Sequence, residues 1–261
     1  MPRKNNDRSF KQPTTQQMST VLFFLVALAS EIVGTVAGFG SSVFFVPLAG
    51  FFFDFHQVLA LTSILHVFSN TAKLVFFGRH IRLRLLLLLG IPSVVAVIAG
   101  AYLSTKLTFR FDELILGLFL VAFSLFLLCK PRAKISATKF NAISAGGLAG
   151  FLAGLIGTGG ALRGLALAAF NLEKGVFVAT SAGIDSGVDF SRMIIYLRSG
   201  YLAPNSLTYI VGLLVIAFVG SYLGKLALGY LNQKYFRQIV LSFVFLIGLI
   251  TLGRAIHQVV C

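Results

Sequence analysis

Charged residues are scarce in this sequence, and acidic residues are the scarcest of them. Only 11% of the 261 residues are charged, with 8 Asp and Glu against 22 Lys and Arg, while 57% are hydrophobic and the mean hydropathy is +0.91. A soluble globular chain carries roughly 25% charged residues, so too few polar groups are present here to cover a soluble surface. This composition excludes a soluble enzyme and a disordered protein, and it indicates a chain surrounded mostly by lipid.

Several motifs of catalysis and metal binding are also missing. The two cysteines, Cys129 and Cys261, have no metal-ligand spacing, and a secreted disulfide scaffold is excluded. No GxxxxGK[ST] motif is present, so ATP does not drive this chain directly, and HExxH and CxxC are absent. Residue types alone do not exclude an intramembrane hydrolase, but this sequence lacks a GxSxG motif. We therefore expect neither a metal nor a cofactor.

Eight stretches are apolar enough to form membrane-spanning helices, which need about 20 residues each. They lie near residues 20–38, 57–77, 85–104, 113–129, 140–156, 176–197, 205–229 and 235–256. Two shorter apolar stretches, at 41–53 and 160–171, follow the first and the fifth. Stretches of that length more often form re-entrant or broken helices. The sequence predicts an all-α polytopic membrane protein with about eight transmembrane helices.

The basic residues suggest an orientation. If the two short stretches do not cross, thirteen bases fall on one side of the membrane and five on the other. Because cytoplasmic loops are enriched in Lys and Arg, we expect both termini to lie in the cytoplasm. If the short stretches do cross, the bases at 79–84 and 130–139 change sides and the bias weakens. Their clustering between apolar runs suits anionic lipid and excludes nucleic acid as a partner.

The chain divides into four predicted parts. Residues 1–19 are polar and are expected to form a disordered cytoplasmic tail. The apolar run from Val21 could imitate a cleavable signal peptide, but the internal repeat described next uses this helix. We expect a first transmembrane repeat at 20–129, a basic cytoplasmic linker at 130–139 and a second transmembrane repeat at 140–261.

An internal repeat appears when the sequence is shifted by 119 residues. Polar positions then coincide within apolar segments: Thr62 with Ser181, His66 with Asp185, Asn70 with Asp189, Lys73 with Arg192, and Arg79 with Arg198. Two homologous four-helix halves in the same orientation explain this match. If the short stretches cross, each half has five helices and the repeat is inverted. Repeats with paired interrupted segments are typical of secondary transporters, whose sites lie at the repeat interface.

Each half also contains a glycine-rich interruption. The residues are Gly38, Gly40, Ser41 and Ser42 in the first half, and Gly157, Thr158, Gly159 and Gly160 in the second. Free N–H groups at the start of a half-helix bind anions with the help of the helix dipole, and the hydroxyls add donors. Close helix packing through small residues is the alternative. Because both halves carry the interruption, we predict a substrate site between the two.

Charged residues within the apolar segments of the second half are the next candidates. Arg163 should face a cavity, a partner or an anion, or else extend its side chain to the interface, because charge at membrane depth is costly. Asp185, Asp189 and Arg192 lie on one helix face. Asp189 and Arg192 are expected to neutralise each other, whereas Asp185 is a candidate proton or cation site for coupling.

The matching face of the first half carries His66, Asn70 and Lys73. His66 corresponds to Asp185 and is a candidate coupling group, although lone histidines in helices are usually packing residues. Lys73 is expected to be structural, with its side chain extending toward Arg79. Glu31 lies in the first predicted helix with Gly150 as its counterpart, and it is a functional candidate as an intramembrane carboxylate.

These motifs resemble the TauE/SafE sulfite exporter family of membrane permeases. The resemblance rests on Gly38-x-Gly40-Ser41-Ser42 ending in Pro47, on Gly157-x-Gly159-Gly160, and on Thr62-Ser63, Thr180-Ser181 and Arg198-Ser199-Gly200-Tyr201. It implies a polytopic bacterial inner-membrane protein and gradient-linked movement of small sulfur-containing anions such as sulfite or sulfoacetate. The serines at 41 and 42, Ala166 in place of a second proline, and Arg163 depart from the family pattern.

The sequence therefore predicts a secondary transporter of a small anion, with the lipid bilayer as its surroundings. Arg163 and backbone N–H groups would hold the anion, and Asp185 with His66 would couple transport to a gradient. A passive anion channel and a non-transporting scaffold or intramembrane enzyme are the alternatives. Whether copies of the chain form a homo-oligomer stays open.

Overall fold

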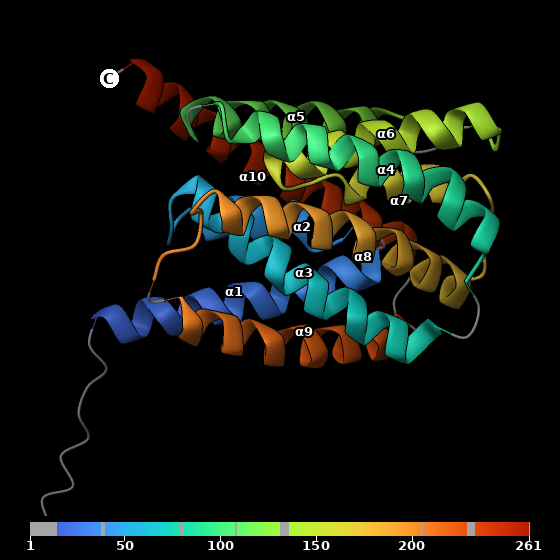
Figure 1. The fold of residues 1–261 in the computed structure, drawn as a ribbon, viewed down its shortest axis with the longest axis horizontal. Helices are drawn as coiled ribbons and strands as arrows, with labels where there is room; N and C mark the ends of the chain where they lie inside the picture. Colours follow the sequence, from blue (N-terminus) through green and yellow to red (C-terminus); the bar gives the residue numbers. More distant parts are fainter. Residues whose placement is uncertain are drawn as a thin grey trace, which may run out of the picture.

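A computed structural model describes residues 15–37, 40–78, 81–107, 109–130, 136–204, 206–228 and 233–260. These residues form ten helices and no strand, so the expected all-α class is confirmed. Figure 1 shows the long helices lying side by side in one bundle. The helices are α1 (Thr15–Ala37), α2 (Ser42–Ala49), α3 (Phe55–Phe77), α4 (Leu83–Ser104), α5 (Phe109–Cys129), α6 (Lys139–Ile156), α7 (Gly160–Ala168), α8 (Lys174–Arg198), α9 (Leu207–Ala227) and α10 (Gln233–Val260).

Seven of the described helices are long and apolar enough to cross a membrane: α1, α3, α4, α5, α6, α9 and α10. The expected eighth span lies in α8, which has sufficient length but at least three charged residues in every 18-residue stretch. Packing explains how this polar helix is accommodated. α8 contacts α3, α4, α6 and α7, so its polar face turns toward protein rather than lipid.

Helices α1 and α3 run in the same direction. Phe23 near the start of α1 packs against Phe53, which precedes α3, with ring centroids 5.1 Å apart. Further along both helices, Glu31 lies 2.7 Å from Lys73. The chain between α1 and α3 therefore returns to the end of the bundle where α1 begins, and α2 lies on this return path (Figure 1).

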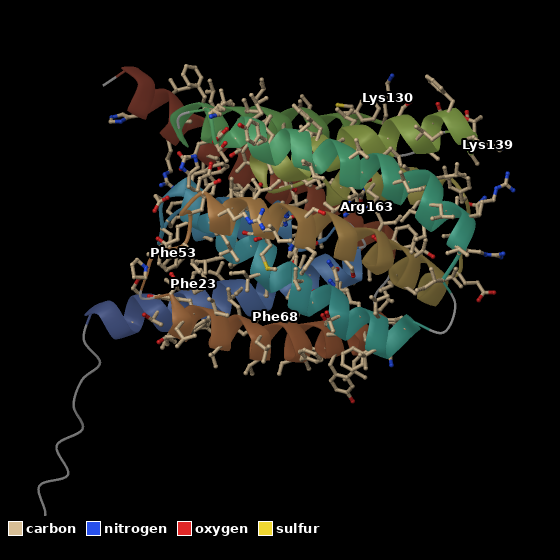
Figure 2. The ribbon with its side chains drawn as sticks, viewed as in Figure 1. Phe23, Phe53, Phe68, Lys130, Lys139 and Arg163 are labelled. Atoms are coloured by element: carbon tan, nitrogen blue, oxygen red, sulfur yellow. The ribbon has the colours of Figure 1, made fainter. Side chains whose placement is uncertain are left out.

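Because of this return, the predicted alternation of membrane sides is wrong from the segment between α1 and α3 onward. The eight-span prediction requires α1 and α3 to be antiparallel. Figure 2 shows Phe23 and Phe53 at one end of the bundle and Lys130 and Lys139 toward the other. Figure 1 shows that α4, α8 and α10 end at the α1-start end, which places Lys106, Arg198 and Arg254 near that end through the bounds of these helices. Helices α4, α6 and α8 begin at the opposite end and α5 ends there, which places Arg82, Arg84, Lys130, Lys139 and Lys174 near it. The basic residues are therefore not divided thirteen to five between the two sides, because the short apolar stretch at 41–53 reverses the chain.

The remaining directions follow from the contacts of small residues. α4 and α6 are parallel, since Gly146, Gly150 and Gly154 pack in turn on the backbone at Leu89, Ser93 and Val97. A side chain at Gly150 would collide with the Ser93 carbonyl, so this spacing of four residues allows the two backbones to approach closely. α1 and α9 are also parallel, whereas α5 and α10, like α3 and α8, are antiparallel.

The two short helices begin next to each other inside the bundle. Gly40 and Gly157 have φ of 81° and 76°, a left-handed conformation that glycine adopts without strain, and they lie just before α2 and α7. A Cβ atom on Gly40 would lie 3.9 Å from the Cα atom of Gly160. Almost every residue of α2 and α7 is buried, so the starts of both helices lie within the protein.

Candidate functional site

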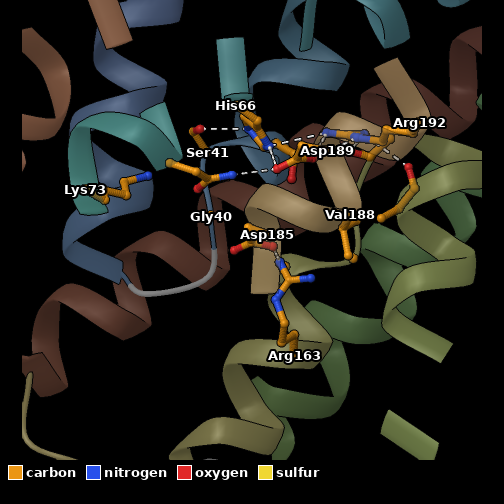
Figure 3. Close-up of a pocket in the computed structure, with 15 residues that line it drawn as sticks. Gly40, Ser41, His66, Lys73, Arg163, Asp185, Val188, Asp189 and Arg192 are labelled. Carbon is orange, nitrogen blue, oxygen red and sulfur yellow. Dashed lines mark hydrogen bonds and ion pairs between the residues drawn. The ribbon is translucent and has the colours of Figure 1, made fainter. Parts of the chain in front are cut away.

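One polar cavity lies where α2 and α7 begin, between α3 and α8 (Figure 3). Its volume is about 30 Å³, which is room for one or two water molecules. Val188 and Ala153 are its apolar members. The other lining residues were all predicted from sequence: Gly40, Ser41, Ser42, His66, Asn70, Lys73, Gly157, Gly159, Gly160, Arg163, Asp185, Asp189 and Arg192. Glu31 and Thr158 lie behind this lining and bond to it, and Gly38 lies outside the described residues.

Glu31 is the centre of a fully bonded cluster. Its carboxylate forms an ion pair with Lys73 at 2.7 Å and accepts hydrogen bonds from the hydroxyls of Ser41, Ser69 and Ser221. Thr35 donates to the same carboxylate at 3.3 Å. The expected extension of Lys73 toward Arg79 is wrong, because Glu31 provides a nearer partner on α1. The repeat alignment gave no sign of this ion pair, because it matches Glu31 with Gly150 and Lys73 with Arg192.

Asp189 and Arg192 form the expected ion pair on α8. The Arg192 Nη2 and Nε atoms lie 2.7 and 2.8 Å from Asp189 Oδ1. Arg192 Nη1 donates to the carbonyls of Ala153 and Gly157 at the end of α6, where helix carbonyls lack partners. Asn70 on α3 donates to Asp189 Oδ2 at 2.7 Å. The pair therefore fixes α3, α6 and α8 together.

His66 connects the Glu31 cluster to the Asp189–Arg192 pair. The Ser41 hydroxyl has one proton and donates it to Glu31 at 2.6 Å, so His66 Nε2–H donates to Ser41 Oγ at 3.0 Å. His66 Nδ1 then accepts from Arg192 Nη2 at 3.3 Å. The same Nδ1 lies 3.5 Å from Asp189 Oδ2, so a proton on this nitrogen would exchange Arg192 for Asp189 as its partner.

Arg163 on α7 forms an ion pair with Asp185 on α8. The sequence paired Arg192 with Asp189 and gave Asp185 no basic partner, and the fold supplies Arg163 as that partner. Arg163 is only 3% exposed, which excludes extension to the interface. Its Nε and Nη1 atoms are buried and have no hydrogen-bond partner among the described residues. Two guanidinium donors at the cavity are therefore free to bind a ligand.

The starts of α2 and α7 supply further donors. Ser42 on α2 donates to the Thr158 hydroxyl at 3.3 Å, which joins the two glycine-rich segments. The first N–H groups of a helix have no partner within it and carry the positive end of the dipole. Both helices therefore direct partial positive charge into the cavity. Among the described residues, no three His, Cys, Asp or Glu residues lie close enough to hold a metal ion.

Sequence reasoning missed the hydroxyl groups around Glu31. Ser69, Ser221 and Thr35 come from α3, α9 and α1, and they are all buried. Small hydroxyl residues are common in membrane helices, where they bond to backbone carbonyls or pack between helices. Their position in the sequence therefore gave no signal that they converge on one carboxylate.

Comparisons with known proteins identify the family of this chain. The family described as sulfite exporter TauE/SafE matches residues 22–251, a range that includes every helix lining the cavity. The chain is also similar to probable membrane transporter protein MJ0441 of Methanocaldococcus jannaschii, with 28% identity over 239 residues that cover 82% of this chain and 86% of the relative. No solved structure matches the chain. This chain belongs to the TauE/SafE sulfite exporter family and is a membrane transporter.

Proposed function

We propose that this protein is a secondary transporter of a small anion, sulfite or an organosulfonate such as sulfoacetate. The observation that carries the proposal is that two nitrogen atoms of buried Arg163, beside the starts of α2 and α7, have no partner among the residues that the structure describes. A planar guanidinium binds an oxyanion through parallel N–H groups, and helix starts favour negative charge. The name of the matching family supports sulfite as the first anion to examine.

The charge balance supports coupling to a proton. Lys73, Arg163 and Arg192 are matched by Glu31, Asp185 and Asp189, so the site is neutral when His66 is neutral. An arriving anion would leave one uncompensated negative charge at membrane depth, which is costly. Proton uptake by Asp185 or His66 would remove that charge. We therefore propose that these two residues couple anion movement to a proton gradient.

We propose that the two halves form an inverted repeat of five helices each, in place of the four-helix parallel repeat. The packing partners support this arrangement: α4 packs on α6 as α9 packs on α1, and α4 packs on α8 as α9 packs on α3. Equivalent helices run in opposite directions. Asn70 and Asp189, which are 119 positions apart, bond directly to each other, as residues near a pseudo-two-fold axis would. The segments 20–129 and 140–261 remain the proposed halves, with 130–139 as the linker.

Both termini are proposed to face the cytoplasm of a bacterial cell, supported by four bases among the first 11 residues. The directions of the helices place the end of α10 on the α1-start side, since Arg254 donates to the Gly50 carbonyl at 3.0 Å. Reporter fusions after Arg84 and after residue 260 test this topology. We expect the first outside and the second in the cytoplasm; fusions on the same side would contradict the inverted arrangement.

Flux into proteoliposomes tests the transport proposal. Purified protein is reconstituted, and uptake of sulfite, sulfoacetate and a panel of other small anions is measured with and without a pH gradient. We expect saturable uptake of at least one sulfur oxyanion that the gradient increases. Absence of gradient-dependent movement across the whole panel would contradict the proposal. A passive channel would instead give flux that does not saturate.

A further inference from the structure

A polar stripe runs along nearly the whole length of α8. Ser181, Asp185, Asp189, Arg192 and Tyr196 are spaced by four, four, three and four residues, which places them on one helix face. The middle of the stripe lines the central cavity. The proposed function uses only this middle part, and the two ends of the stripe differ from each other.

Toward the start of α8, the stripe borders a second cavity. This cavity shares Gly40, Asn70, Lys73 and Asp185 with the central one and continues along Ser181. Its other lining residues, from α1 and α8, are Gly34, Thr35, Phe177, Val178 and Ala182. The central site therefore continues through a partly polar passage toward the end of the bundle where α8 begins.

Toward the end of α8, three stacked rings follow Arg192 instead. Tyr196 and Tyr201 stack with centroids 5.3 Å apart and an interplanar angle of 12°, and Tyr201 stacks on His56 at 4.2 Å and 13°. Tyr196 is fully buried and donates to the Gly154 carbonyl at 2.5 Å. The stack therefore lies between the central site and the α1-start end of the bundle.

The turn after α8 places Tyr201 in this stack. Gly200 has a φ of 75°, and the Tyr201 and Gly200 amides donate to the carbonyls of Tyr196 and Leu197. This is the Schellman ending of a helix, in which the residue after the glycine folds back on the last turn. The ring of Tyr201 is held by a local turn and by stacking, so it can leave the stack without unwinding α8.

A buried carboxylate lies at the outer end of the stack. Asp112 on α5 is fully buried, lies 3.5 Å from His56 Nε2 and accepts from the Ser104 hydroxyl at 3.4 Å. Its Oδ1 atom makes no hydrogen bond to the described residues. A carboxylate that served only packing would be fully bonded in this position. His56 Nε2 also has no hydrogen-bond partner among the described residues, so the outer end of the stack holds an incompletely bonded carboxylate beside an incompletely bonded imidazole.

We propose that Tyr201, stacked between Tyr196 and His56, is the closed gate of the transport path along α8. This inference rests on the proposed function, because it assigns one closed end to the same path. The repeat gives the other end no equivalent stack: the positions 119 residues from Tyr196, Tyr201 and His56 are Phe77, Arg82 and Gly175. Tyr201 moves to admit the anion, and His56 lies behind it, 3.5 Å from Asp112.

Sided labelling of a cysteine in the central cavity tests the gate. Cys129 and Cys261 are replaced by serine, Ser42→Cys is introduced, and a membrane-impermeant methanethiosulfonate is added to vesicles of known orientation. A separate Ser136→Cys variant, at the exposed linker end, marks the orientation. We expect Ser42→Cys to be labelled only from the linker end. With Tyr201→Ala added, labelling from the stack end should rise at least about tenfold.

Matched variants separate gating from damage to the fold. Tyr209→Ala removes a tyrosine at the same end that packs on Phe23, Phe24 and Phe53, and it should leave labelling one-sided. Tyr201→Phe keeps the ring and should also stay one-sided. If Tyr201→Ala does not fold, His56→Ala removes the outer ring and should open the same end. One-sided labelling in Tyr201→Ala and in His56→Ala, where these variants fold, or labelling from the stack end in the parent with all three rings intact, would overturn the gate.

The labelling experiment tests the gate and the flux experiment tests the proposed function, so either proposal can be overturned without the other. Labelling requires a path but no transport cycle, so opening by Tyr201→Ala without anion flux in the parent would retain the gate and overturn the proposed function. Anion flux in a protein whose labelling never depends on Tyr201 would retain the function and overturn the gate.

Discussion

The Glu31–Lys73 pair and the Arg163–Asp185 pair are both buried ion pairs at the central site, but they differ in completeness. Glu31 is fully buried and has five side-chain partners from α1, α2, α3 and α9. Within the described part of the chain, Arg163 has one ion pair and two nitrogen atoms without a partner, and the Asp185 side chain is 16% exposed. A fully bonded pair stabilises one arrangement of helices, whereas an incompletely bonded pair retains capacity for a ligand. Under the proposed function, the first pair holds the helices together and the second binds the anion.

The largest expected effect comes from breaking the complete pair. Glu31→Gln removes the charge that balances Lys73, and a buried charge left unpaired costs about 3–5 kcal/mol. The free energy of unfolding in detergent should fall by this amount. The double variant Glu31→Gln with Lys73→Met should recover part of the loss, because no unpaired charge remains. A loss below about 1 kcal/mol in the single variant would remove the structural role from Glu31.

Arg163→Gln should affect transport more than stability. It removes the free guanidinium donors, and we expect anion uptake to fall roughly 100-fold, since charge-assisted bonds to the anion are lost. Unfolding should change less than in Glu31→Gln, because Asp185 retains the Ser181 hydroxyl at 3.2 Å. Arg254→Gln is the control, as that guanidinium lies on Phe51 outside the cavity. Uptake within about threefold of the parent protein would contradict the binding role.

Asp185→Asn should separate movement from coupling. The amide cannot take up a proton in the same way, so stimulation by a pH gradient should fall about tenfold while exchange without a gradient continues. Uptake at several external pH values, compared with exchange at equal pH, measures the two rates. Unchanged stimulation would transfer the coupling role to His66 or favour a channel.

Ser221→Ala gives the smallest expected effect. It removes one of the hydroxyls that bond Glu31, at 3.1 Å, and one such bond contributes about 1 kcal/mol. The free energy of unfolding should fall by about that amount with transport unchanged. Ser144→Ala on the exposed face of α6 is the control. A loss of transport in Ser221→Ala with normal stability would place the Glu31 cluster in the transport path.

The helices and most of the cavity lining were predictable because their signals are local. Long apolar runs predict spans, and polar residues such as Asn70 and Asp189 at one offset predict a shared site; the fold brings these residues together around one cavity. Pairings between distant helices were not predictable. Arg163 and Asp185 meet through the turn between α7 and α8, and Glu31 meets Lys73 because α1 and α3 are parallel.

The direction of the chain was the largest error, and its cause is physical. The segment from Gly40 to Phe53 is too short and too buried to resemble a spanning helix, yet it returns the chain toward the start of α1. Hydropathy identifies segments that are apolar enough to face lipid, whereas α2 and α8 pack against protein instead. Counting bases on each side then placed the loops of the first half wrongly.

A structure determined with a bound anion tests the central claim most directly. The protein is crystallised or imaged with sulfite or sulfoacetate, and the anion is located in the density. The account predicts an anion oxygen about 2.7–2.9 Å from Arg163 Nε or Nη1, at the starts of α2 and α7. An anion bound elsewhere along the bundle, with Arg163 still paired only to Asp185, would contradict it.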